Sequence, residues 1–191
     1  MKKKMRSFFA VLLTFGMVLG LTACGGDSGS GGGGGDSGST SSKKVTGEPF
    51  ETSLMSALTP SGWMAFPKAD YFGDYPDEPG DPHGIRLHKG AKEEFDQFTT
   101  PGIQIDYFED GTEMYDTKLW YEDIEEMDPI TTGDYTWEAF STESEDTDII
   151  VLSTTEPKQI QVTIFPTLGD KAKISLKDAD VQAILSSIAI K

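Results

Sequence analysis

A stretch of glycine and serine divides the chain and limits the part that can fold into a compact domain. Residues 25–44 read GGDSGSGGGGGDSGSTSSKK, and a segment of this composition has too few apolar side chains to form a core. Folding is therefore confined to residues 45–191, a length typical of one domain. We expect residues 24–44 to be a flexible tether, about 25 Å long on average as a random coil.

The segment before the tether has the layout of an export signal. Residues 1–23 begin with a basic head and continue as an apolar run that ends in small residues, as signal peptides do. The run is about 16 residues long, whereas a membrane-spanning helix needs about 20. The string LTAC, residues 21–24, resembles a bacterial lipobox. That resemblance implies cleavage before Cys24, acylation of its thiol (palmitate being one such acyl chain), and a lipid anchor on the extracytoplasmic face of the cell membrane.

Cys24 is also the only cysteine in the chain. An intramolecular disulfide is therefore impossible, and lipidation explains why an exported protein carries one cysteine. Residues 45–191 contain no thiol, which excludes a cysteine nucleophile, cysteine-ligated zinc and iron–sulfur clusters from the domain.

The domain is strongly acidic. Residues 45–191 hold 30 acidic and 10 basic side chains, a net charge of −20. Nucleic acid is excluded as a partner, since it is bound by clustered Lys and Arg. Anionic lipid head groups repel such a surface, so the acyl chains and not the domain are expected to hold the protein at the membrane.

The apolar pattern predicts a strand-rich domain that ends in a helix. Strands are expected at 50–58 and 63–66, paired across a turn, and then at 85–88, 103–107 and 135–140. Residues 149–152 and 160–164 are expected to pair as an antiparallel hairpin. Helical turns are predicted at 92–98 and a short helix at 117–127. The last helix has a stripe at i, i+3, i+4 and i+7 and Asp178 or Asp180 as its cap. Its members are Val181, Ile184, Leu185 and Ile188.

Several phrases resemble the PsbP-like domains. They are TPSGWMAFPKAD, GDYTWEAF, IQVTIFP and ISLKDADVQAILSSIAI. The resemblance covers most of residues 45–191 and implies an α+β fold, an antiparallel β-sheet flanked by helices in an α/β/α sandwich with the C-terminal helix packed on the sheet. It implies no catalytic residues and no assigned activity.

A proline-rich loop at residues 70–83 supplies the candidate contact residues. Aromatic rings beside carboxylates suit sugars, cationic groups or a protein partner, and the same carboxylates suit an irregular calcium site. The alternative is a solvated loop whose rings pin it to the sheet. The candidates are Tyr71, Phe72, Asp74, Tyr75, Asp77 and His83.

Catalytic patterns are weak. His83 and His88 are five residues apart, which places them on opposite faces of a strand. Carboxylates are too abundant to identify the fixed pair of a hydrolase. We therefore expect a non-catalytic binding or assembly module without a cofactor, contacting an envelope protein or a small ligand. The alternatives are a calcium- or small-ligand-binding accessory protein that uses the acidic aromatic loop, and a carboxylate hydrolase.

Overall fold

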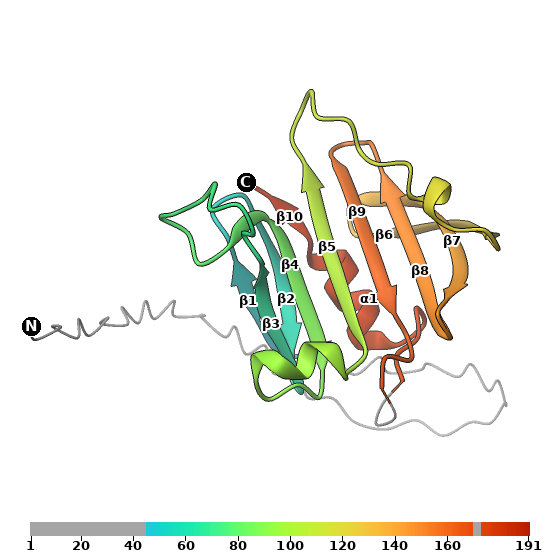
Figure 1. Ribbon diagram of the computed structural model, residues 1–191, viewed down its shortest axis with the longest axis horizontal. Coiled ribbons are helices and arrows are strands. Elements are labelled where there is room, and N and C mark those ends of the chain that lie inside the picture. Colours follow the sequence, from blue (N-terminus) through green and yellow to red (C-terminus); the bar gives the residue numbers. More distant parts are fainter. Residues whose placement is uncertain (1–44, 170–172) are drawn as a thin grey trace, which may run out of the picture. The chain divides into compact units, whose positions relative to one another are not determined.

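The computed structural model describes residues 45–169 and 173–191, which form two antiparallel sheets (Figure 1). The predicted signal peptide, Cys24 and the tether lie outside the described residues. The smaller sheet has the order β1-β2-β10, with β1 Gly47–Glu51, β2 Met55–Pro60 and β10 Ala189–Ile190. The larger has the order β3-β4-β5-β9-β8-β7-β6, with β3 Trp63–Lys68, β4 Asp81–Lys89, β5 Gly102–Phe108, β9 Gln159–Phe165, β8 Thr147–Thr154, β7 Tyr135–Ser144 and β6 Glu125–Thr132.

The described residues contain one α-helix, α1 at Ala179–Ser187, and two short 3₁₀ helices, η1 at Glu94–Phe98 and η2 at Thr117–Trp120. The predicted α+β sandwich with helices flanking the sheet is therefore wrong: the fold is mostly β. The flanking helices were implied by the resemblance to PsbP-like domains, and the described residues supply α1 as the one helix that packs on the sheet. No helix within the described ranges is long and apolar enough to cross a membrane.

One face of the seven-stranded sheet forms the core. Alternate residues of its central strands point to this face, where α1 and β2 cover them. Figure 1 shows α1 behind the sheet. The buried residues of the central strands are Ile85, Leu87, Ile103, Ile105, Ile160, Val162 and Ile164. The period-two alternation thus leaves a second, more polar face toward solvent.

Helix α1 is anchored at its first turn. The Asp180 carboxylate accepts a hydrogen bond from Trp63 Nε1 at 2.8 Å and pairs with Lys89 Nζ at 2.8 Å. Burial alone raises the pKa of Asp180, but these two partners outweigh it and hold the pKa below its ordinary value. Asp178 is the N-cap, and its side chain makes no capping bond to the helix. The helix is therefore located by β3 and β4 and not by its cap.

The strand predicted at 50–58 divides in two. The backbone N–H groups of Leu54 and Met55 donate to Thr52 Oγ1, which forms the turn between β1 and β2. The predicted pairing of this segment with 63–66 is wrong, because β2 and β3 belong to different sheets. Met55 and Ala57 instead bury their side chains in the core shared by the two sheets.

The helix predicted at 117–127 ends after one turn. Only η2 is helical, and from Glu125 the chain pairs with β7 as strand β6. Two effects explain the error. Glu122 would face Glu125 and Glu126 at i+3 and i+4 in a helix, where like charges repel, and the hydrogen bonds to β7 outweigh a weak helical preference.

Other predicted elements are confirmed. Strand 103–107 is β5, the hairpin around residues 156–157 joins β8 to β9, and residues 92–98 contain η1. The predicted stripe is buried at all four positions, although Ile188 lies just past the end of α1. Trp63 and Trp137 are packed in the core.

Leu185→Ala tests the docking of α1. Leu185 is 0% exposed, so its truncation is expected to lower the free energy of unfolding by about 2–5 kcal/mol. Leu119→Ala is the matched control, because Leu119 is 81% exposed and its loss should cost under about 0.5 kcal/mol. Denaturant melts measure both variants, and equal midpoints would contradict the packing described.

Candidate functional site

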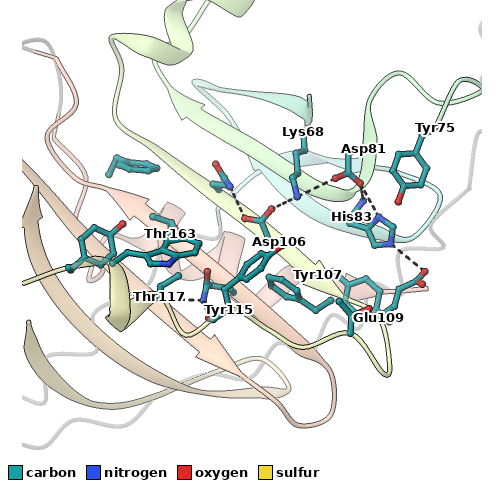
Figure 2. Close-up of a pocket in the computed structure, with 17 residues that line it drawn as sticks. Lys68, Tyr75, Asp81, His83, Asp106, Tyr107, Glu109, Tyr115, Thr117 and Thr163 are labelled. Atoms are coloured by element: carbon teal, nitrogen blue, oxygen red, sulfur yellow. Dashed lines mark hydrogen bonds and ion pairs between the residues drawn. The ribbon is translucent and has the colours of Figure 1, made fainter. Parts of the chain in front are cut away.

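A cleft of about 620 Å³ lies on the solvent face of the seven-stranded sheet (Figure 2). Its floor is formed by β4, β5 and β9, and one wall by the segment 108–121. Register explains the polar floor, because Asp106 lies opposite both Gly84 and Gln161, and Gln104 lies opposite Thr163. Residues that alternate with the core residues of these strands are thus brought together on the other face.

Lys68 is at the centre of the charged part of the cleft. Its ammonium lies 3.2 Å from Asp81 Oδ2 and 3.0 Å from Asp106 Oδ1. The β3–β4 register shifts between Pro67, which pairs with Ile85, and Lys68, which pairs with Asp81; bulges of this kind change which residues face each other, and here Lys68 lies directly opposite Asp81. The ion pair with Lys68 is the interaction made by Asp106 Oδ1, while Gln104 Nε2 donates to Asp106 Oδ2 at 2.7 Å. Three strands are thereby joined through one cation.

Gly84 makes room for the Lys68 stem. A Cβ atom on Gly84 would lie 2.5 Å from Lys68 Cδ and 2.8 Å from its Cβ, closer than real contacts allow. Position 84 therefore requires glycine, because the Lys68 side chain passes close to the backbone there. Such a close approach is a common reason for glycine inside a strand.

His83 extends the polar network along β4. Its Nδ1 lies 2.9 Å from Asp81 Oδ1 and its Nε2 lies 3.3 Å from Glu109 Oε1. The ring stacks on Tyr107 at 6.3 Å and lies 5.5 Å from Tyr75, measured between ring centroids. Both ring nitrogens thus face carboxylates, and two aromatic rings lie beside the imidazole.

Aromatic side chains form the wall supplied by the segment 108–121. Phe108 contacts Tyr115 edge-on at 5.6 Å, and Tyr115 lies 5.7 Å from Trp120. Tyr115 and Trp120 are 60% and 64% exposed, so their rings are available for contact. Gln161 Nε2 lies 3.4 Å from Tyr115 O and from Thr117 Oγ1, which ties this wall to β9.

The pKa values of Lys68, Asp81 and Tyr75 move away from neutrality. Burial lowers the pKa of Lys68, but Asp106 and Asp81 outweigh burial and raise the pKa above its ordinary value. Burial raises the pKa of Asp81, yet hydrogen bonds from His83 and the Lys68 charge bring it below its ordinary value. Burial, followed by nearby carboxylates, raises the pKa of Tyr75. These groups therefore keep one protonation state around neutral pH.

The structure separates the residues predicted from the loop 70–83. Tyr75 and His83 line the cleft. Tyr71 and Phe72 are 78% and 90% exposed, and Tyr71 lines a separate hollow beside η1. Asp74 and Asp77 are exposed in the loop. The loop is thus not one site: only its final part belongs to the cleft.

The two histidines do not act together. His88 is buried, and its Nδ1 lies 3.1 Å from Thr100 O. Burial, partly offset by the bond to Thr100, lowers the pKa of His88. It packs against Gly102, where any Cβ would meet the imidazole ring. His88 is therefore a packed core-edge residue, whereas His83 lines the cleft.

No group of three or more His, Cys, Asp or Glu side chains is arranged to hold a metal ion within residues 45–169 and 173–191. Asp70 shows why the acidic loop does not gather such a group. Its carboxylate accepts the backbone N–H groups of Gly73, Asp74 and Tyr75. These bonds, of which that from Tyr75 is the strongest influence, lower the pKa of Asp70. The carboxylate thus stabilises its own loop.

The residues that sequence reasoning missed are Lys68, Asp106, Tyr115, Trp120 and Gly84. Two signals were present in the sequence. Gly84 inside a strand marks a close approach, and Asp106 inside a central strand is unfavourable without a partner. The exposed aromatic wall gave no such signal. The spacing of Trp120 fits the buried face of the helix predicted at 117–127, so the sequence did not mark it as exposed.

No protein-family model, curated protein or solved structure matches the chain. The function must therefore be inferred from the cleft itself.

Asp81→Asn tests the charged network. Because the pKa of Asp81 in the folded chain is below 3.8, its stabilisation is complete above that pH and is lost as the pH falls through the folded pKa. We expect the variant to be less stable by about 1 kcal/mol at pH 7. Denaturant melts should show this difference shrinking toward pH 2. The exposed Asp77→Asn should show no comparable difference, and a deficit that is independent of pH would contradict the ion pairs.

Proposed function

We propose that this protein is a lipid-anchored, extracytoplasmic binding module that holds its ligand in the cleft without chemical conversion. The observation that carries the proposal is the combination of an internally paired polar floor with an exposed aromatic wall. Polar groups already held in place fix the orientation of a ligand, and rings available for contact supply affinity. The cleft also has the volume of ordinary ligand sites, about 300–1,000 Å³.

The protonation states favour binding over catalysis. A general acid or base works best when its pKa lies near the working pH. Asp81 is shifted toward permanent ionisation and Lys68 toward permanent protonation. A carboxylate hydrolase needs one carboxyl group whose pKa is raised, and Asp81 is shifted in the opposite direction. His83 has both nitrogens against carboxylates, so neither nitrogen is open to a substrate.

Calcium binding is less well supported than binding of an organic ligand. Calcium needs six to eight oxygen ligands. Asp70 is occupied by backbone N–H groups, and Asp81 and Asp106 are paired with Lys68. The cation position of the cleft is thus filled by the protein's own ammonium group.

The anchor follows from the sequence. The basic head, the apolar run and the lipobox-like string before Cys24 support export and acylation, and two acyl signals are enough for stable attachment. An acidic domain on a tether of residues 24–44 is then held near the membrane without lying on anionic lipid. A cleft in this position meets envelope components.

Cys24→Ser tests the anchor. Serine offers no thiol for the thioether to the lipid, so the variant should incorporate no labelled fatty acid and should leave the membrane fraction. Metabolic labelling followed by fractionation measures both effects. Because the chain has one cysteine, equal labelling of wild type and variant would rule out this anchor.

Photo-crosslinking in intact cells tests the cleft. A photoreactive phenylalanine analogue replaces Tyr115 in one variant and Phe72 in a second, since both side chains are exposed aromatics but only Tyr115 lines the cleft. We expect a crosslinked product from position 115 that is reduced about tenfold by Trp120→Ala. A product from position 72 alone would place the contact on the loop and contradict the proposal.

A further inference from the structure

We infer that the ligand of the cleft is an uncharged saccharide, with one sugar ring packed on Trp120 and its hydroxyl groups bonded to the polar floor. This inference rests on the proposed binding function and assigns its ligand class. Three properties of the cleft lead to it: the sign of its charge, the pairing of that charge, and the hydrogen-bonding groups that remain.

Anionic ligands are disfavoured by the charge of the cleft. Lys68 is outnumbered by Asp81, Asp106 and Glu109, all of which line the same space. An incoming carboxylate or phosphate would meet a net negative field, and the one ammonium is already bound to two carboxylates. Like charges brought into a partly buried site cost free energy.

Cationic ligands are disfavoured for a different reason. An aromatic wall beside carboxylates would suit an ammonium group, but Lys68 already occupies the position between Asp81 and Asp106 at 3.2 and 3.0 Å. Its side chain is about two-thirds buried and its pKa is raised, so it remains charged and in place. A second cation would find only Glu109, which is largely exposed.

The groups that remain are neutral donors and acceptors. Gln104 uses Nε2 to bond Asp106, and its Oε1 accepts no hydrogen bond from any residue of the described ranges. The hydroxyl groups of Thr112 and Thr163, which also line the cleft, make no side-chain bond to another described residue. Amides and hydroxyls of this kind pair with hydroxyl groups, which both donate and accept.

The wall supplies the other half of a sugar site. Trp120 and Tyr115 lie 5.7 Å apart with their planes inclined by 38°, and both rings are more than half exposed. The C–H face of a pyranose ring is apolar and its rim is polar. Such a ring can bury its face against an aromatic side chain while its rim reaches the amides and carboxylates of the floor. The Lys68 ammonium, held by its two carboxylate partners, also has one further N–H to donate to that rim.

The test uses the full-length chain and a panel of uncharged tetrasaccharides of glucose, mannose, galactose and N-acetylglucosamine. Trp120 is the exposed member of three tryptophans, since Trp63 and Trp137 are buried. Acrylamide quenching of tryptophan fluorescence therefore reports on the cleft directly. We expect at least one tetrasaccharide to protect Trp120 from quenching in a saturable manner.

Variants locate the effect. Trp120→Ala should weaken binding of that tetrasaccharide about tenfold or more by calorimetry, and Trp120→Phe should recover part of it. Leu119→Ala, on the same 3₁₀ turn and 81% exposed, should bind as the wild type does. Because Trp120 is exposed, thermal melts of its variants should match the wild type. Equal binding by Trp120→Ala would overturn the assignment of the cleft.

A cationic probe separates the ligand classes. The tetramer of glucosamine matches that of N-acetylglucosamine but carries ammonium groups in place of acetamides. Tighter binding of the charged tetramer, or of choline, would overturn the saccharide assignment in favour of a cation. If no tetrasaccharide binds while crosslinking at position 115 persists, the ligand class is wrong and the binding function stands. If both are absent, both inferences fail.

Discussion

The fold depends on how one seven-stranded sheet is covered. A sheet has two faces, and the described residues supply one α-helix and a three-stranded sheet to cover the first. The apolar residues of β4, β5 and β9 are buried there, and the alternation of the strands then fixes what lies on the second face. A shift of one residue in β5 would exchange Ile105 with Asp106. The core and the cleft are therefore specified by the same register.

The open face is made stable by pairing its charges. An unpaired Asp106 between strands would be costly, and Lys68 offsets that cost by joining it to Asp81. The pairing also determines what the face can do, because groups held in one protonation state orient a ligand but exchange protons poorly. A smaller apolar cluster lies on this face at strands β7 and β8 and consists of Phe140, Ile149 and Val151. The stability of this face and the binding proposed for it thus rest on one arrangement.

Sequence reasoning succeeded where one periodicity dominated a segment. Alternation identified β5 and the β8–β9 hairpin, and the spacing of Val181, Ile184, Leu185 and Ile188 identified α1. It failed where local pattern and sheet pairing disagreed, as at β6. The likeness to PsbP-like domains led to flanking helices that the described residues do not form. Local phrases of sequence do not determine which face of a sheet receives a helix.

The cleft was only partly predictable for a related reason. Tyr75 and His83 lie close together in the sequence, among many aromatic and acidic residues. Lys68, Asp106 and Trp120 come from three distant segments, and only the topology of the sheet brings them together. Tyr75 was grouped with Tyr71 and Phe72 because the three are close in sequence. In the structure Tyr75 lines the cleft, whereas Tyr71 lines a separate hollow. The sequence pattern pointed to aromatic residues beside carboxylates and included Tyr75 and His83, but not the other residues of the cleft.

We propose that the polar face of the sheet receives the ligand, whereas the apolar face is closed by the core. The three tryptophan indole N–H groups report on it in one NMR spectrum, because Trp63 donates to Asp180, Trp137 donates to Thr132, and Trp120 is exposed beside the cleft. The structure predicts that the Trp120 indole exchanges rapidly with solvent and shifts when ligand is added, while the other two exchange slowly and stay unchanged. A ligand-induced shift at Trp63 or Trp137 with none at Trp120 would contradict it.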